Sequence, residues 1–137
     1  MSQAQPGGST TEPVKTILIV EDDDHISEFL ERVISEETTY KPLVVTDGFE
    51  ALKVTQEVKP NLFVLDYHLP GMDGIELYDR LHAEKAFQDI PALIISARLP
   101  KRELDKRSLA GLHKPLELSE LLQKIEEVLE SSERNSS

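Results

Sequence analysis

Short apolar runs alternate along the chain with segments in which apolar residues recur at helical spacing. Apolar runs of this length are typical of buried strands. Five strands are predicted, at Ile17–Val20, Leu43–Val45, Leu62–Leu65, Ala92–Ile95 and a short stretch around Leu112. Because helical segments separate the strands, the pattern predicts an α/β fold in which helices cover both faces of a parallel sheet.

The helical segments carry an apolar face and recognisable starts. One face of the first helix consists of Ile26, Phe29, Leu30, Val33 and Ile34, and one face of the last consists of Leu118, Leu121, Leu122, Ile125 and Leu129. Two helices between them are expected to begin at Asp47 and Asp73, since a glutamate follows each aspartate three residues later, as in a capping box. Asp24 is the expected N-cap of the first helix. Pro42 cannot donate to a strand ladder, so the second strand is expected at an edge of the sheet.

The two ends of the chain differ in composition from the part between them. Residues 1–13 and 131–137 are polar and rich in small side chains, with too few apolar groups to offset the entropy of ordering. We therefore expect a disordered tail at each of these ends and a single folded domain over residues 14–130. A total of 137 residues agrees with one domain.

Charge and residue usage argue against several classes of protein. The formal net charge of −11 argues against nucleic acid as a partner, because phosphate backbones require a basic surface. The chain has no cysteine, which excludes disulfides, thiol nucleophiles and cysteine metal sites. It also shows no apolar run of membrane-spanning length and no signal-peptide pattern at its start. These features predict a cytoplasmic protein that binds neither nucleic acid nor membranes.

Polar side chains stand at the carboxyl ends of four of the five predicted strands. They are Glu21 and Asp22 after the first strand, Asp66 after the third, Ser96 after the fourth and Lys114 after the fifth. Right-handed crossovers bring these strand ends to one rim of the sheet, which is where binding sites form in such folds. Each residue alone has an ordinary explanation, such as a solvated acid, a helix cap or an exposed turn lysine. Their joint placement at one rim predicts a functional site.

Four segments of the sequence resemble the receiver domain of two-component response regulators. They are ILIVEDD from Ile17, LFVLDYHLPGMDG from Leu62, PALIISA from Pro91 and HKP from His113. Together they extend over nearly all of the folded region. The resemblance implies a flavodoxin-like (CheY-like) three-layer sandwich with a five-stranded parallel sheet in the order 2-1-3-4-5, which again places the second strand at an edge.

The resemblance also implies a role for each residue at the rim. Asp66 would be the phosphoacceptor, because a carboxylate can act as a nucleophile toward phosphorus. Lys114 and Ser96 would contact the phosphoryl oxygens. A Mg²⁺ ion would offset the repulsion between the acids and the incoming anion. Its ligands would be Asp22, Asp66, the backbone carbonyl of His68 and, through a water, Glu21.

The same resemblance implies how the domain takes part in signalling. It would receive its phosphoryl group from a sensor histidine kinase or a histidine-phosphotransfer protein, and lose it again by hydrolysis at the same site. It would catalyse its own phosphorylation and dephosphorylation without being a conventional enzyme. We expect a stand-alone, monomeric response regulator of a phosphorelay, which passes its signal on by protein contact or by phosphotransfer.

Three other functions fit parts of this pattern. A degenerate receiver that only binds proteins would not need the full set of acids, hydroxyl and lysine. A phosphoaspartyl phosphatase has a second acid two residues after its nucleophile, where this chain has His68. A calcium loop beginning at Asp66 would need oxygen ligands at its fifth and twelfth positions, which Pro70 and Leu77 occupy.

The segment between Ser96 and Lys114 departs from the family pattern. It is a few residues short, and Gly111 stands where the family carries an aromatic residue three positions before the lysine. We therefore expect a short or irregular fourth helix, a local reordering of this loop on phosphorylation, and no strong dimerisation through this face. Five basic residues also gather here: Arg98, Lys101, Arg102, Lys106 and Arg107. They form either a docking surface or an ordinary solvated face.

Overall fold

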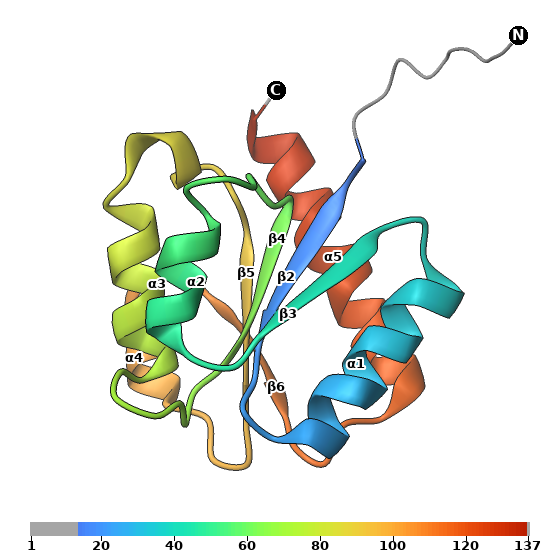
Figure 1. Ribbon diagram of the computed structural model, residues 1–137. Coiled ribbons are helices and arrows are strands. Elements are labelled where there is room, and N and C mark those ends of the chain that lie inside the picture. The colour runs from blue at the N-terminus through green and yellow to red at the C-terminus, as the bar shows by residue number, and fades with distance from the viewer. Residues whose placement is uncertain (1–13, 137) are drawn as a thin grey trace, which may run out of the picture.

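The computed structural model describes residues 14–136 of the chain, with side chains described as far as residue 133. Its strands are β2 (Thr16–Val20), β3 (Lys41–Val45), β4 (Leu62–Asp66), β5 (Ala92–Ser96) and β6 (Ala110–His113). Its helices are α1 (Asp24–Glu37), α2 (Gly48–Val54), α3 (Gly74–His82), α4 (Lys101–Lys106) and α5 (Leu118–Ser136), with a short 3-10 helix at Lys85–Phe87. Strands and helices alternate along the chain as the sequence pattern predicted (Figure 1).

The described strands form one parallel sheet in the order β3-β2-β4-β5-β6. In chain order this is 2-1-3-4-5, which confirms the predicted flavodoxin-like fold and the edge position of the strand that contains Pro42. The register pairs Val20 with Leu65 and Asp66 with Ile95. The carboxyl ends of β2, β4 and β5 therefore lie side by side at one rim.

Helices pack on both faces of the sheet, and the alternation of β2 shows how the two layers are separated. Ile17 and Ile19 lie in the apolar layer under α1 and α5, whereas Leu18 and Val20 lie in the layer under α2, α3 and α4. All four side chains are fully buried, which stabilises the fold by roughly 1.5–3 kcal/mol for each. This burial fixes β2 on both sides and so fixes where the residue after Val20 emerges at the rim.

Helix starts agree with the sequence at two positions and differ at a third. Asp47 and Asp73 cap α2 and α3, and each accepts a hydrogen bond of 2.8 Å from the backbone amide three residues later. The cap of α1 is Asp23, so the expectation of Asp24 was wrong by one residue. Asp23 Oδ1 accepts a hydrogen bond from the amide of Ile26 at 3.0 Å. In a run of acids each residue has capping chemistry, and the extended backbone at Asp23 decides which one caps.

The end of the chain also differs from the expectation. The structure continues α5 to Ser136, into the residues 131–137 for which a tail was predicted. Adding a residue to an existing helix costs far less than starting one, so a polar sequence can extend it. Ser132 Oγ also donates a hydrogen bond to the Asp89 carbonyl at 3.3 Å. Ser137 and the predicted N-terminal tail lie outside the described residues.

Candidate functional site

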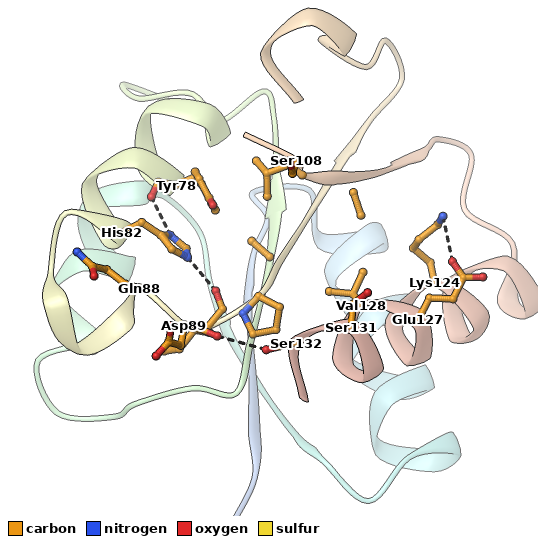
Figure 2. A pocket seen from close by; sticks show the side chains of 15 residues that line it. Tyr78, His82, Gln88, Asp89, Ser108, Lys124, Glu127, Val128, Ser131 and Ser132 are labelled. Carbon is orange, nitrogen blue, oxygen red and sulfur yellow. Dashed lines mark hydrogen bonds and ion pairs between the residues drawn. The ribbon is translucent and has the colours of Figure 1, made fainter. Parts of the chain in front are cut away.

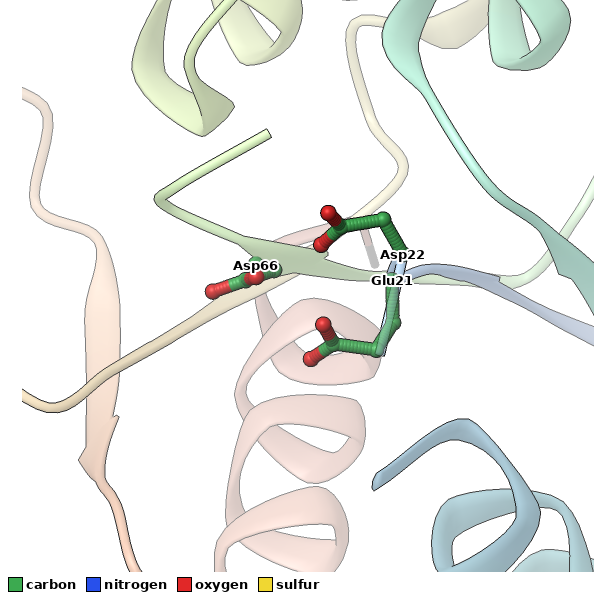
Figure 3. A group of neighbouring side chains, drawn as sticks. All are labelled: Glu21, Asp22 and Asp66. Carbon is green, nitrogen blue, oxygen red and sulfur yellow. The ribbon is translucent and has the colours of Figure 1, made fainter. Parts of the chain in front are cut away.

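Three acidic side chains meet at the carboxyl end of the sheet and are called the acid cluster below (Figure 3). Asp66 ends β4 and Glu21 follows β2, and both are almost fully buried, whereas the adjacent Asp22 is exposed. One carboxylate oxygen of each lies within 4.8 Å of the others. The register explains this approach, because Val20 pairs with Leu65 and the next residues on the two strands are Glu21 and Asp66.

Lys114 places one positive charge beside two of the acids. It follows β6 and precedes Pro115, to which it is joined by a cis peptide bond. Its Nζ lies 3.2 Å from Glu21 Oε1 and 3.3 Å from Asp66 Oδ1. Its backbone amide donates a hydrogen bond of 2.9 Å to the Ser96 carbonyl, which holds this turn against the end of β5. One ammonium thus faces two buried carboxylates, and the site keeps an excess of negative charge.

This excess of negative charge and the burial of the site change two pKa values. Burial and, next, the adjacent carboxyl group of Asp66 raise the pKa of Glu21 to about 7. Burial alone would lower the pKa of Lys114, but the charges of Glu21 and Asp66 hold it above its ordinary value. The charge states of Glu21 and of the half-buried Lys114 therefore depend both on burial and on neighbouring groups.

Glu21 Oε1 is the one buried side-chain atom among the described residues that lacks a hydrogen-bond partner. Its contact with Lys114 is short enough for an ion pair, but the two groups are not aligned for a hydrogen bond. The other oxygen of Glu21 accepts from the amide of Asp23 at 3.1 Å. A buried carboxylate oxygen without a donor, close to two further acids, is the kind of position that a bound cation completes.

Ser96 and His68 lie at the same rim. Ser96 ends β5 directly after Ile95, the register partner of Asp66. Its hydroxyl donates to the carbonyl of Arg98 at 2.8 Å and accepts from the amide of Arg98 at 3.0 Å, so it bonds to its own loop and not to Asp66. The amide of His68 lies 3.4 Å from Asp66 Oδ1, which places the His68 backbone beside the carboxylate. The structure therefore brings together all six residues that the sequence predicted for the site.

Gly74 is a further residue of this site, and the sequence pattern gave it no role. A Cβ atom there would lie 2.5 Å from the carbonyl oxygen of Asp66 and 3.0 Å from the Cα of Tyr67. The amide of Gly74 donates a hydrogen bond of 2.9 Å to the Tyr67 carbonyl. The start of α3 can therefore approach the end of β4 this closely only with glycine. The glycine directly after the Asp73 cap was visible in the sequence, but its contact partner was not.

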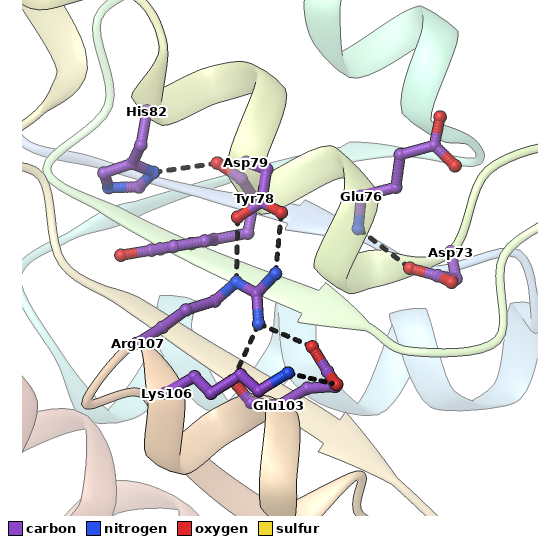
Figure 4. Close-up of polar contacts among 8 residues, drawn as sticks. All are labelled: Asp73, Glu76, Tyr78, Asp79, His82, Glu103, Lys106 and Arg107. Atoms are coloured by element: carbon purple, nitrogen blue, oxygen red, sulfur yellow. Dashed lines mark hydrogen bonds and ion pairs between the residues drawn. The ribbon is translucent and has the colours of Figure 1, made fainter.

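The segment of residues 97–109, called the α4 segment below, contains a helix of six residues, which confirms the expected short fourth helix. Two of its five basic residues have acidic partners (Figure 4). Arg107 donates through Nε and Nη2 to the two carboxylate oxygens of Asp79 on α3, both at 2.8 Å, and through Nη1 to Glu103 Oε1 at 3.0 Å. Lys106 pairs with Glu103 at 3.4 Å. Arg107 thus ties α4 to α3, and the basic surface is smaller than the sequence indicated.

A hollow of about 440 Å³ lies at the opposite end of the sheet, between α3, α5 and the starts of β5 and β6 (Figure 2). The ring nitrogens of His82 in its wall lie 3.1 Å from the Tyr78 carbonyl and 2.8 Å from the Ile90 carbonyl. Among the described residues, the acid cluster is the group of three or more acids or histidines that are close enough to share one metal ion. It lies at the other end of the sheet. Side-chain chemistry therefore identifies the rim, and not this hollow, as the candidate site.

Comparison with known proteins agrees with the geometry of the rim. A family model described as the response regulator receiver domain matches residues 17–126. The response regulator MprA of Mycobacterium leprae (strain TN) is 35% identical over 117 residues, which are 82% of this chain and 50% of that protein. The alkaline phosphatase synthesis transcriptional regulatory protein PhoP of Bacillus subtilis (strain 168) is 38% identical over 92 residues, 67% of this chain and 36% of that protein. The chain spans half or less of the length of these relatives.

Solved structures share the fold. A response regulator receiver domain protein (CheY-like) from Methanospirillum hungatei JF-1 superposes with a TM-score of 0.80 at 26% identity, covering 90% of this chain and 99% of that one. The chemotaxis protein CheY4 of Vibrio cholerae gives a TM-score of 0.78 at 23% identity, covering 85% of this chain and 99% of that one. The second likeness supports the fold alone.

Proposed function

Because the chain belongs to the response regulator receiver domain family, we propose that it accepts a phosphoryl group on Asp66 from a phosphohistidine donor. The observation that carries this proposal is the setting of Asp66 at the end of β4. Its carboxylate is buried, lies in the acid cluster and has Lys114 Nζ 3.3 Å from Oδ1. A carboxylate nucleophile with a fixed cation beside it fits acceptance of an anionic group.

The proposed reaction is a single transfer. A carboxylate oxygen of Asp66 forms a bond to phosphorus while the bond between phosphorus and the donor's histidine nitrogen breaks. The bonding electrons go to that nitrogen, which then takes a proton. Lys114 stabilises the negative charge on the phosphoryl oxygens, and the Ser96 hydroxyl has one hydrogen to donate to one of them. Hydrolysis at the same site would remove the phosphoryl group. The domain would then catalyse changes only in itself and would not be a conventional enzyme.

The acid cluster fits a divalent magnesium ion, which prefers oxygen ligands. Three carboxylates within 4.8 Å of one another, one of them with an unpartnered buried oxygen, supply such ligands. Asp22 and Asp66 would hold the ion directly with the backbone carbonyl of His68, and Glu21 through a water. When bound, the ion would supply positive charge that offsets both the acids and the incoming phosphoryl group.

Thermal melting tests the magnesium site separately from phosphorylation. Mg²⁺ should raise the melting temperature of the wild-type protein by linkage, since the ion binds the folded site. Asp22→Asn removes one charge from the cluster, so this variant should be more stable without metal and should gain less from Mg²⁺ than wild type. Asp24→Asn, on the exposed first turn of α1, is the matched control. An equal gain in wild type and Asp22→Asn would remove Asp22 from the ligand set.

The proposed donor is a sensor histidine kinase or a histidine-phosphotransfer protein. A protein that reaches Asp66 would meet an apolar hollow of about 450 Å³ beside Lys114, whose lining includes Ile26, Phe29 and Leu116.

No helix among residues 14–136 is long and apolar enough to cross a membrane. Passage of the signal by protein contact or phosphotransfer belongs to this proposal. Stand-alone action and the monomeric state stay predictions, since the matched relatives are at least twice as long as their matched regions.

Mass spectrometry of the intact chain tests the phosphoacceptor. Acetyl phosphate with Mg²⁺ should add one phosphoryl group to wild type and none to Asp66→Asn, because an amide does not attack phosphorus as a carboxylate does. Asp73→Asn is the control, since Asp73 caps α3 and asparagine caps equally well. Equal phosphorylation of Asp66→Asn and wild type would refute the assignment. A wild-type protein that gains no mass would favour the alternative, a degenerate receiver that only binds proteins.

A further inference from the structure

Phe49 is a large apolar side chain at the start of α2, and 56% of its surface is exposed. A single exposed apolar residue is ordinary on a protein surface and indicates no role by itself. The role of Phe49 depends on what the covered part of its ring contacts. That part lies against Gly71 in the segment of residues 67–73, which joins β4 to α3 and is called the β4–α3 loop below.

Gly71 allows this contact because it has no Cβ. A Cβ atom there would lie 2.9 Å from Phe49 Cε2, and the next nearest atoms outside the adjoining residues belong to the same ring, at 3.8 and 3.9 Å. The φ angle of Gly71 is +79°, which residues with a side chain rarely adopt. Gly71 is also the only glycine of the β4–α3 loop. The ring therefore restrains the residue of this loop that has the widest conformational freedom.

The start of α2 gives the ring a fixed support. Asp47 Oδ1 accepts a hydrogen bond of 2.8 Å from the amide of Glu50, and Glu50 Oε1 accepts one of 2.9 Å from the amide of Thr46. These reciprocal bonds resemble a capping box and hold the backbone on both sides of Phe49. The ring is exposed, but the helix turn that carries it is not free to move away from the loop.

The β4–α3 loop is held at both ends, and Phe49 lies over its middle. The amide of Tyr67 donates to a carbonyl of β5 at 2.9 Å. Leu69 and Met72 are buried, and the Met72 sulfur lies 2.9 Å from where a Cβ atom on Gly48 would be. The two residues between Leu69 and Met72 are exposed. Phe49 thus covers the part of the loop that the core does not hold.

The path of this loop affects the acid cluster through His68. The amide of His68 lies 3.4 Å from Asp66 Oδ1, and its carbonyl is a proposed magnesium ligand. A backbone carbonyl has no rotamers, so its direction follows the path of the chain. Mg²⁺ requires nearly ideal octahedral geometry, so a ligand that points in several directions binds it less well.

We propose that Phe49 positions the β4–α3 loop for magnesium binding. The inference rests on the proposed magnesium site of the acid cluster. With the ring in place Gly71 is restrained, and the backbone of His68 keeps its place beside Asp66. Without the ring the loop exchanges among several paths, and in only some of them is His68 well placed. Phe49 is a positioning residue, since its contact is with Gly71 and not with a proposed ligand.

Calorimetric titration of the full chain with magnesium chloride tests this role. Phe49→Ala should weaken magnesium binding on the order of 10-fold, as the loss of groups that orient metal ligands does. Phe49→Tyr keeps the ring and should bind Mg²⁺ as wild type does. Tyr40→Ala removes an aromatic ring directly before β3, at the opposite end of the sheet, and should leave the Kd for Mg²⁺ unchanged.

The outcomes separate this inference from the proposed magnesium site. Equal Kd values in wild type and Phe49→Ala would overturn the role of Phe49 and leave the site standing. A wild-type protein that binds no Mg²⁺ would overturn both. Equal weakening in Phe49→Ala and in either Phe49→Tyr or Tyr40→Ala would show that the effect is not specific to the ring of Phe49, and would also overturn its role.

Nitrogen-15 relaxation of the metal-free protein tests the mechanism without the ion. In Phe49→Ala the amide order parameter of Gly71 should fall from about 0.85, typical of rigid backbone, toward about 0.6, and that of His68 should fall with it. Leu77, a buried residue of α3, should keep its wild-type value, which shows that the variant is folded. Unchanged order parameters at Gly71 and His68 would overturn the inference, whatever the effect on magnesium binding.

Discussion

The acid cluster and the α4 segment border the same rim but are stabilised by opposite means. Glu21 and Asp66 stand at the ends of strands whose apolar residues are fully buried, yet their charges repel and leave one buried oxygen unpartnered. In the α4 segment Arg107 satisfies Asp79 and Glu103, but Leu104 is the only fully or nearly fully buried residue of the described helix. The first region is fixed by packing, and the second is fixed by a few polar and apolar contacts.

This difference matters for the proposed function, in which the acid cluster holds the reactive groups and the α4 segment responds to them. Strong burial of the strands allows repelling charges to stay in place, which the proposed binding of a cation and a phosphoryl group requires. A segment with few buried contacts opens at a small free-energy cost. The three predictions below remove, in turn, the positive charge of Lys114, the negative charge of Glu21 and the Arg107 bridge of the α4 segment.

The largest effect is expected from Lys114→Met, which removes the positive charge beside the acid cluster and keeps the length of the side chain. We expect the rate of phosphorylation by acetyl phosphate to fall on the order of 100-fold, as for loss of one preorganised charge-stabilising donor. Lys124→Met, on α5 and away from the rim, is the control. Rates from intact mass that agree within about twofold between Lys114→Met and wild type would exclude the proposed role.

The second prediction concerns the pH dependence of stability without metal. The pKa of Glu21 rises from 4.5 to about 7 on folding, so the folded state keeps a proton that the unfolded state loses. The contribution of Glu21 to the free energy of unfolding is fully present below pH 4.5, and it is lost as pH rises through about 7. Glu21→Gln cannot ionise, and it should be more stable than wild type by on the order of 2 kcal/mol at pH 8. Near pH 4.5 the two should agree.

Urea unfolding in EDTA at both pH values measures this difference. Glu28→Gln, an exposed position on α1, should follow wild type at each pH. A Glu21→Gln variant with the same pH dependence as wild type would show that the acid cluster holds no unfavourable charge.

The fold and the acid cluster were predictable because each depends on short patterns in the sequence. Fully buried parallel strands appear as apolar runs, and parallel strands place their carboxyl ends together. Two such runs end at Val20 and Leu65, and because these residues pair in the sheet, Glu21 and Asp66 emerge side by side. Pro42 likewise restricts its strand to an edge by its missing amide hydrogen alone.

The α4 segment was predicted only in outline, because its contacts join residues that no local pattern connects. Its short length could be read from the spacing between Ser96 and Lys114. Arg107 and Asp79 are 28 residues apart, and the sequence indicated nothing of their bridge. The absent aromatic at Gly111 was visible, but the leucines that fill its space were not, since their packing depends on the path of the whole segment.

The smallest effect is expected from Arg107→Lys. Arginine reaches both carboxylate oxygens of Asp79 and also Glu103, and a lysine ammonium keeps the charge but cannot span these positions. We expect a loss of about 1 kcal/mol or less in the free energy of unfolding, because the partners are partly exposed. The α4 amides should exchange faster, while phosphorylation of Asp66 is unchanged. Arg80→Lys, in the more exposed pair with Glu76, is the matched control. Urea unfolding measures the loss of unfolding free energy in each variant. Equal losses would show that the Arg107 bridge stabilises α4 no more than an ordinary surface pair.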